Sequence, residues 1–396
     1  MMPPKEEQFP ADKVAFAVVG CGSIGRRHLA VIDEESRAGL AAFCDSDPKV
    51  LDETARLYPG VPCFTDYGDM LRGVDFDVVN ICTPHGLHAP MAIQAAQARR
   101  NALVEKPMAL SPEDCNRMIE AARLNDVLLM VVKQNRFNVP IALTKMALDS
   151  GMMGRIFMVQ CNVLWNRHDG YYNDSPWRGK KLLEGGALHT QASHFIDLMI
   201  WWFGDVTEAQ ARVETKNHSI EIEDCGTAQL QFASGVMGSL TWTTCVYNKN
   251  YEGSITIIGE HGTIKIGGQY LNKIEVWDVR SLPLPEDTAF TDKPNSYGKY
   301  QGTSSNHDKV IGSVVAALLH ERHNVIEGDE GIRTIKAIDM IYSSAQLQAR
   351  RAPRLAASGD KSQFRRIAEP LQPAALTYAA ARAKDEESHE PNSASL

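Results

Sequence analysis

The sequence lacks a long hydrophobic run, and this argues against a membrane-spanning helix. Its most apolar stretch, residues 196–204, is much shorter than the roughly 18 residues that a bilayer requires. The N-terminal segment MMPPKEEQFPADK has no apolar core of the kind found in secretory signal peptides. We therefore expect a cytoplasmic protein without membrane contact.

The sequence also lacks a basic excess and any close spacing of cysteines. It contains 41 Lys and Arg against 49 Asp and Glu, a formal net charge of −8, which disfavours the basic face that nucleic-acid binders use. Its 8 cysteines are scattered without a CxxC pair, so neither a zinc site nor a disulfide framework is indicated. Free cysteines fit a reducing compartment.

The first third of the chain alternates short apolar runs with amphipathic stretches. This pattern predicts a parallel sheet with helices on both faces, a Rossmann domain, over residues 13–134. Ser111, Pro112 and Glu113 together form a favourable helix start. The expected strands are 13–20, 40–45, 76–82, 101–107 and 127–133, and the expected helices are 24–35, 47–58, 87–98 and 111–124.

The pattern changes after residue 137, where strands with period-two alternation follow one another without helices between them. Successive strands such as 227–233 and 236–242 predict a mostly antiparallel open sheet. We expect an α+β domain over 135–350 for substrate binding and oligomerisation, whose late helices pack back on the first domain, and a flexible tail over 352–396. Its other expected elements are helices at 138–150, 187–202, 306–320 and 329–350, a strand at 155–165 and an aromatic loop at 166–186.

A glycine-rich turn, Gly20-Cys21-Gly22-Ser23-Ile24-Gly25, joins the first expected strand to the first expected helix. A helix N-terminus offers free N–H groups to phosphates, and this strand–turn–helix context supports a dinucleotide site. Asp45 follows Gly25 by 20 residues at the end of the second strand. Its carboxylate suits the two ribose hydroxyls of NAD and would repel the 2′-phosphate of NADP.

Two further segments carry groups suited to proton transfer. Lys106 lies in Glu105-Lys106-Pro107, at the carboxyl end of a parallel strand, where open α/β sheets bind ligands. In the segment 185–198, a helix would place Thr190, His194 and Asp197 on one face, with His194 as a base oriented by a carboxylate. Taken alone, the first segment also fits a loop with a solvated lysine, and the second fits a polar stripe facing a core.

Five motifs in one order give this chain a family resemblance. They are GCGSIGRRHL (20–29), CDSDP (44–48), TPHGLHAP (83–90), EKP (105–107) and GGAL-x5-HFIDL (185–198). This set, over about residues 13–350, resembles the Gfo/Idh/MocA oxidoreductases, which implies an NAD-dependent dehydrogenase with Lys106 and His194 as catalytic residues. Many members have Asp at the position of Thr190; threonine is no base, so proton transfer falls to His194 and Lys106.

The aromatic loop narrows the resemblance to the WlbA/WbpB subgroup. Those enzymes oxidise the C3 hydroxyl of UDP-N-acetylglucosaminuronic acid for surface polysaccharide synthesis, and some recycle NADH with 2-oxoglutarate. The implied cofactor-binding residues are Gly20, Gly22, Ser23, Ile24, Gly25, Asp45, Thr83, Pro84, His88, Glu105, Lys106, Gln134, Trp177 and Arg178. The implied substrate-binding residues are Lys106, Arg136, Asn166, Arg167, Tyr171, Ser175, Thr190, Gln191 and His194.

The chemistry of the loop supports this interpretation. Arg167 and Arg178 are suited to bidentate contacts with a carboxylate or a diphosphate, and Trp177 offers a flat face to a ring. His85 with His88, and His189 with His194, lack a third ligand, so no metal is expected. The family also implies a homodimer or homotetramer.

Three alternatives remain open from the sequence. The protein is a dehydrogenase of a free sugar or inositol, a non-catalytic sensor of NAD(H), or a glycosidase that uses NAD transiently. The presence of Lys106 and His194 argues against the sensor.

Overall fold

The structure is a computed structural model that describes residues 10, 12–286, 294–296 and 301–351. The chain divides into two units, Met1–Ala349 and Arg350–Leu396, and both large sheets belong to the first. The tail expected over 352–396 lies outside the described residues. Among the described helices, none combines the length and the apolar character that a bilayer crossing demands.

The first sheet has the strand order β16-β6-β5-β4-β1-β2-β3 in the described part of the chain. Five strands match expectation, and all pairs are parallel except β16 with β6. The order 3-2-1-4-5-6 is that of a dinucleotide-binding Rossmann sheet, so the predicted fold of this region is confirmed. The strands are β1 (Val14–Val19), β2 (Ala38–Cys44), β3 (Cys63–Phe64), β4 (Val78–Ile81), β5 (Asn101–Val104), β6 (Leu129–Val131) and β16 (Ile326–Glu327).

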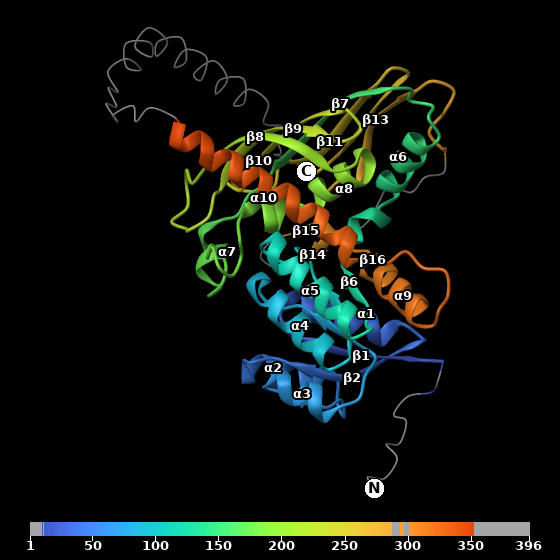
Figure 1. Ribbon diagram of the computed structural model, residues 1–396, viewed down its shortest axis with the longest axis vertical. Helices are drawn as coiled ribbons and strands as arrows, with labels where there is room; N and C mark the ends of the chain where they lie inside the picture. Colours follow the sequence, from blue (N-terminus) through green and yellow to red (C-terminus); the bar gives the residue numbers. More distant parts are fainter. Residues whose placement is uncertain (1–9, 11, 287–293, 297–300, 352–396) are drawn as a thin grey trace, which may run out of the picture. The chain divides into compact units, whose positions relative to one another are not determined.

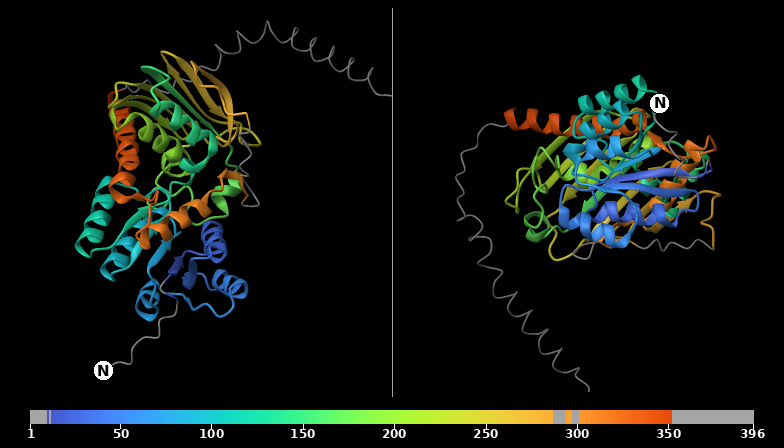
Figure 2. Two further views of the ribbon diagram at one scale, coloured as in Figure 1. Left: turned by 90° about the vertical axis from the view of Figure 1, so that its right-hand side faces the viewer. Right: turned by 90° about the horizontal axis from the view of Figure 1, so that it is seen from below.

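Both faces of this sheet are covered by helices because successive side chains of each strand point to opposite sides. In β1, Ala15, Ala17 and Val19 enter one buried cluster, which α3, α4 and α5 complete. Val14, Phe16 and Val18 enter a second cluster with α1, α2 and α9. Figure 2 shows these helices on both sides of the sheet. They are α1 (Ser23–Glu34), α2 (Pro48–Leu57), α3 (Tyr67–Gly73), α4 (His88–Gln97), α5 (Pro112–Leu124) and α9 (His307–Leu318).

Local sequence accounts for where these helices begin. The side chain of Ser111 accepts a hydrogen bond from Asp114 N, with Pro112 at the first helical position of α5, as expected. Asp47 caps α2 in the same way by accepting from Lys49 N. The short elements β3 and α3 were not anticipated, since residues 59–75 show no clear periodicity.

The second sheet has the order β13-β12-β11-β7-β10-β9-β8 among the described strands. All of its pairs are antiparallel except β7 with β10, which confirms the expected mostly antiparallel sheet. Its strands are β7 (Ile156–Leu164), β8 (Val206–Glu214), β9 (Cys225–Phe232), β10 (Met237–Thr243), β11 (Glu252–Gly259), β12 (Gly262–Gly267) and β13 (Lys273–Val279). A two-stranded sheet of β14 (Pro294–Ser296) and β15 (Gln301–Ser304) lies apart from it.

Helical segments run between the two sheets and beneath the second. A short 3-10 turn, η2 (Gln134–Phe137), leads into α6 (Val139–Asp149), and α8 (Ser193–Phe203) is buried beneath the second sheet. The last helix, α10 (Gly328–Arg351), begins beside β6, where Gly331 packs on Val131, and extends to β8, where Ala211 N donates to Ser344 Oγ (Figure 1).

One expected helix differs from the prediction. The segment expected as a continuous α-helix over 187–202 starts as a π-helical turn, η3 (Leu188–Ala192), before α8 begins. Every residue from Ala187 to Ile200 is buried, so the hydrophobic pattern carries no period that would show the wider turn. Such π turns are often found at functional sites.

Candidate active site

The glycine-rich turn lies between β1 and α1 at the carboxyl edge of the first sheet. Gly20 has a φ of +87°, and a Cβ on Gly25 would lie 1.8 Å from Gly20 O, so close packing demands glycine there. A Cβ on Gly22 would meet nothing within 4 Å, which leaves open space in front of α1. Ser23 is exposed and Ile24 partly buried at this helix start, where Gly22 provides no side-chain cap.

Asp45 is held at the end of β2 by two backbone donors. Its Oδ2 accepts from Cys21 N at 2.7 Å and its Oδ1 accepts from Asp47 N at 2.9 Å. The carboxylate is therefore fixed directly beside the glycine-rich turn. This is the placement that the NAD preference inferred from the sequence requires.

The loop after β4 brings Thr83, Pro84 and His88 to the same edge. His88 Nδ1 lies 2.8 Å from Pro107 O and its Nε2 lies 2.9 Å from Thr83 O. The ring therefore connects the loop after β4 with the loop after β5. Burial lowers the pKa of His88, while the contacts with the carbonyls of Pro107 and Thr83 raise it.

Lys106 extends from the end of β5 towards the second domain. Its Nζ donates to Thr190 O at 2.9 Å, which brings the two sequence motifs together across 84 residues. The side chain is partly exposed. Burial lowers the pKa of Lys106 from 10.5 to about 8, with Arg178 and Arg167 acting in the same direction and Glu105 and Glu184 opposing them.

Glu105 lies behind Lys106 in a buried polar cluster. Asn80 Nδ2 donates to His28 Nδ1 at 2.9 Å, so His28 Nε2 carries the proton and donates to Glu105 Oε1 at 2.8 Å. His307 Nε2 lies 3.3 Å from the same oxygen. Burial alone would raise the pKa of Glu105, but the contacts with His28 and His307 outweigh it and hold the pKa well below its usual value.

His194 follows the π turn at the start of α8 and is 5% exposed. Burial, together with the nearby charges of Lys106 and Lys133, holds the pKa of His194 well below its usual range. The imidazole is therefore neutral at physiological pH, the form from which a general base acts.

Asp197 does not act as the expected partner of His194. Its two carboxylate oxygens bind Arg136 Nε and Nη2, each at 2.9 Å, and Lys133 Nζ at 3.1 Å. Arg136 also donates to Glu330 Oε1 at 2.5 Å. The guanidinium of Arg136, predicted to bind substrate, is thus bound by two carboxylates, and its role in substrate binding stays a prediction.

Arg167, Tyr171 and Gln191 form a connected polar group. Arg167 Nη2 donates to Gln191 Oε1 at 2.6 Å, and Gln191 Nε2 donates to Tyr171 Oη at 3.0 Å. Arg167 Nη1 also donates to Asn250 Oδ1 at 3.1 Å. Asn166 is anchored through Nδ2 to Val246 O at 2.5 Å. Since Gln191 neighbours Thr190, this group lies beside the Lys106 contact.

The remaining loop residues stack on one another. The Trp177 ring meets the His85 ring edge-on at 5.0 Å, and the Arg178 guanidinium lies 3.9 Å from the centre of the Tyr171 ring. Ser175 is partly exposed in the same loop, and its N–H donates to Tyr172 O at 3.4 Å. The loop predicted to recognise a sugar nucleotide therefore packs against the loop after β4.

Sequence reasoning missed two buried polar residues at this site. Glu184 is 1% exposed and its carboxylate accepts from Thr190 Oγ1. The amide of Asn135 is 2% exposed, and both its polar atoms, like Gln134 Oε1, lack a hydrogen-bond partner among the described residues. The available signals were an acidic residue directly before Gly185-Gly186 and consecutive amides after β6.

Two side-chain clusters in the described part of the chain have the composition of a cation site. They are His28, Glu105 and His307, and His218, Asp224 and Cys245. In the first, His28 donates to Glu105 and His307 Nε2 lies 3.3 Å from the same carboxylate oxygen; in the second, His218 Nδ1 bonds Asp224 Oδ2 at 3.0 Å. His189, which the sequence pairs with His194, stacks on Tyr342 at 5.6 Å.

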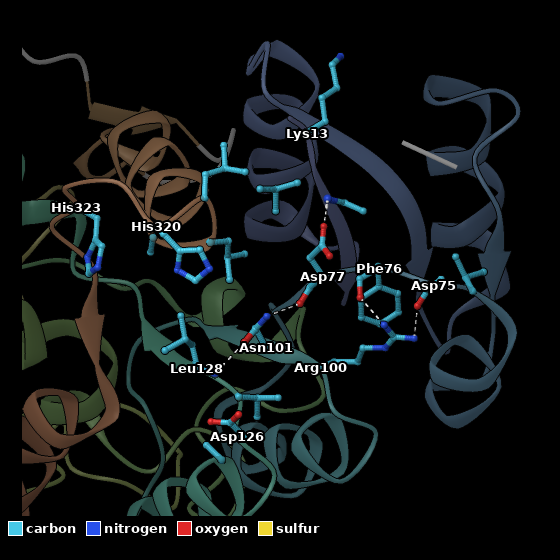
Figure 3. Close-up of a pocket in the computed structure, with 18 of the residues that line it drawn as sticks. Lys13, Asp75, Phe76, Asp77, Arg100, Asn101, Asp126, Leu128, His320 and His323 are labelled. Carbon is cyan, nitrogen blue, oxygen red and sulfur yellow. Dashed lines mark hydrogen bonds and ion pairs between the residues drawn. The ribbon is translucent and has the colours of Figure 1, made fainter. Parts of the chain in front are cut away.

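A large cavity of about 1360 Å³ lies at the opposite edge of the first sheet, where the parallel strands begin. Its polar groups bind one another: Asp77 Oδ2 accepts from Ala15 N, and Arg100 binds Asp75 and Phe76 O (Figure 3). Because ligands of open α/β sheets bind at the carboxyl ends of the strands, this cavity is not the candidate site.

The chain is similar to known oxidoreductases along most of its length. A family profile described as an oxidoreductase family with an NAD-binding Rossmann fold matches residues 14–133, and one for the GFO/IDH/MocA C-terminal domain matches residues 141–265. Among curated proteins, 1-carboxy-3-chloro-3,4-dihydroxycyclohexa-1,5-diene dehydrogenase of Comamonas testosteroni is 29% identical over 62% of this chain and 62% of its own length.

Two solved structures are more similar. The WlbA dehydrogenase of Bordetella pertussis, in complex with NADH and UDP-GlcNAcA, is 38% identical with a TM-score of 0.77, over 84% of this chain and 97% of that one. The WlbA dehydrogenase of Chromobacterium violaceum, in complex with the same two molecules, is 36% identical with a TM-score of 0.78, over 85% and 95%. The matched profiles, the two sheets and the glycine-rich turn agree, and the chain belongs to the Gfo/Idh/MocA family of NAD-binding oxidoreductases.

Proposed function

We propose that the protein oxidises the C3 hydroxyl of UDP-N-acetylglucosaminuronic acid to the 3-keto sugar, as a step in surface polysaccharide synthesis. The observation that carries the proposal is the contact of Lys106 Nζ with Thr190 O. It places the ammonium group of the first domain beside the segment that holds His194 and Gln191. The similarity to two proteins crystallised with NADH and UDP-GlcNAcA supports this choice of substrate.

The residues of the glycine-rich turn fit the cofactor. Open space before Gly22 and the free N-terminus of α1 suit a pyrophosphate, and Asp45 suits an unphosphorylated ribose. Bound NAD⁺ supplies the hydride acceptor. Gln134 Oε1 and both amide atoms of Asn135, in the turn after β6, lack partners among the described residues and are suited to a carboxamide.

The chemistry needs one base and one cation. His194, neutral because it is buried, would take the hydroxyl proton, and NAD⁺ held at the glycine-rich turn would supply the acceptor for the C3 hydride. Lys106, as an ammonium, stabilises the developing alkoxide until the C3–O bond becomes a carbonyl. Arg167, held in place by Gln191 and Asn250, together with Arg178, offers positive charge to the carboxylate or diphosphate of the substrate.

The test compares substrates and variants. Purified protein with NAD⁺ is offered UDP-N-acetylglucosaminuronic acid, myo-inositol and free hexoses, with and without 2-oxoglutarate, and products are identified by mass. We expect only the nucleotide sugar to lose two hydrogens. Lys106→Met and His194→Gln should each lower turnover by about 10²–10⁴-fold and retain NAD affinity in calorimetry.

A surface variant provides the control. Lys180→Met removes a lysine that is 54% exposed and paired with Glu221, and its turnover should equal that of wild type. Turnover of free sugars alone would refute the nucleotide-sugar substrate. Full activity in both site variants would refute the assignment of Lys106 and His194, and NAD binding without any turnover would indicate a sensor.

A further inference from the structure

Glu184 forms hydrogen bonds with three segments that meet at the candidate site. Its Oε1 accepts a hydrogen bond from Thr190 Oγ1 at 3.0 Å, and its Oε2 accepts from Gly179 N. Its backbone carbonyl lies 2.9 Å from His85 Nδ1. One residue thus joins the aromatic loop, the π turn and the loop after β4. Burial raises the pKa of Glu184, whereas the two hydrogen bonds to its carboxylate and the nearby Arg178 and Arg167 oppose the shift and favour the ionised form.

Thr190 stands between Glu184 and Lys106. Its hydroxyl donates to Glu184, while its backbone carbonyl accepts from Lys106 Nζ. The hydrogen bond from the Thr190 hydroxyl to Glu184 therefore also restrains the position of the Thr190 carbonyl. Loss of the hydroxyl bond would leave a buried carboxylate oxygen without this donor and free the carbonyl to move.

Two arginines and two glutamates act on Lys106 in opposite directions. Arg167 and Arg178 lower the pKa of Lys106, while Glu105 and Glu184 raise it. Glu105 belongs to the first domain and contacts His28 and His307 there. Glu184, by contrast, comes from the second domain. The charged groups that act on Lys106 are Glu105, Arg167, Arg178 and Glu184. The neighbouring titratable groups His85, His88 and His194 have their pKa values lowered by the charge of Lys106.

We propose that Glu184 is a positioning residue for Lys106: it fixes the Thr190 carbonyl that holds the ammonium group, and its carboxylate places a negative charge in a site that also contains two arginines. The inference rests on the role of Lys106 proposed above. The competing explanation is that Glu184 only anchors the loop and has no electrostatic effect on Lys106. The two differ in whether the titration of Lys106 depends on the charge of Glu184.

The decisive measurement follows the titration of Lys106 directly and does not require turnover. Reductive ¹³C-methylation labels the lysines, and the resonance lost in Lys106→Met identifies Lys106 in NMR titrations. In Glu184→Gln, which keeps the size of the side chain but removes its charge, we expect Lys106 to titrate about one pH unit lower than in wild type. Glu221→Gln is the matched control, because Glu221 is exposed in a pair with Lys180. It should leave the Lys106 titration unchanged.

A second pair of variants tests the positioning separately from the charge. Thr190→Val removes the hydroxyl at nearly constant volume, and we expect kcat for UDP-N-acetylglucosaminuronic acid to fall about tenfold with Lys106 titrating as in wild type. Thr190→Ser restores a hydroxyl and should restore kcat.

The outcomes separate this inference from the proposed function. An unchanged Lys106 titration in Glu184→Gln would overturn the charge role. Equal kcat in Thr190→Val and wild type would overturn the positioning role, even if Glu184→Gln fails to fold. Absence of turnover in wild type would refute the proposed substrate and leave the NMR result intact.

Discussion

The pH dependence of kcat/KM should report the protonation of Lys106. Burial, with Arg178 and Arg167 nearby, lowers the pKa of Lys106 to about 8, so the stabilising ammonium is lost as the pH rises through this value. Each further pH unit reduces the protonated fraction about tenfold, and kcat/KM at pH 9 should be about a tenth of its value at pH 7. The pKa of His194 lies well below its usual range, so no limb near pH 6.5 is expected from it.

The assay is a pH series of initial rates with UDP-N-acetylglucosaminuronic acid at saturating NAD⁺. The positive nicotinamide adds repulsion and places the limb at or below about pH 8. Lys106→Arg carries a permanent charge, so whatever activity it retains should lack this limb. A rate that rises through pH 8 would refute the reasoning, because it would mean that neutral Lys106 accepts the proton.

Three further predictions concern the cofactor and the fold. Asp45→Ala should weaken NAD binding about 10–100-fold and reduce discrimination against NADP, measured by calorimetry with both; tight, NAD-selective binding would contradict the role of Asp45. Asp197→Ala leaves Lys133 and Arg136 without their shared buried counterion and should cost about 3–5 kcal/mol in denaturant unfolding, whereas Asp69→Ala, in an exposed pair, should cost less than about 1 kcal/mol. Burial raises the pKa of Glu223 to about 7, so the folded state binds its proton more tightly than the unfolded state. Stability should therefore fall between about pH 4.5 and 7, by at most about 3 kcal/mol, and this slope should be smaller in Glu223→Gln.

The first domain was largely predictable because its signals are local. The glycine-rich turn, Asp45 and the start of α5 at Ser111 each follow from residues close in sequence and are found as expected. The alternation of expected strands and helices along the chain likewise predicted the parallel sheet. Bounds differed by a few residues, since helix and strand ends depend on caps and pairing partners.

The candidate site was less predictable because it depends on contacts between distant segments. Lys106 and Thr190 are 84 residues apart, and His28 and Glu105 are 77 apart. Asp197 has the right helical spacing to orient His194, yet it binds cations from another segment, which periodicity cannot show. Glu184 lies in a loop, where the hydrophobic periodicity of helices and strands gives no signal.

The packing of α9 and β16 on the first sheet has a consequence for synthesis on the ribosome. Val310, Ile311, Val314 and Val315 of α9 fill the same buried cluster as Phe16 and Val18 of β1, and β16 pairs with the edge strand β6. The buried cluster on this face of the nucleotide-binding half is therefore completed by residues far along the chain. The part of the face that α9 covers can be filled only after more than 300 residues have been translated.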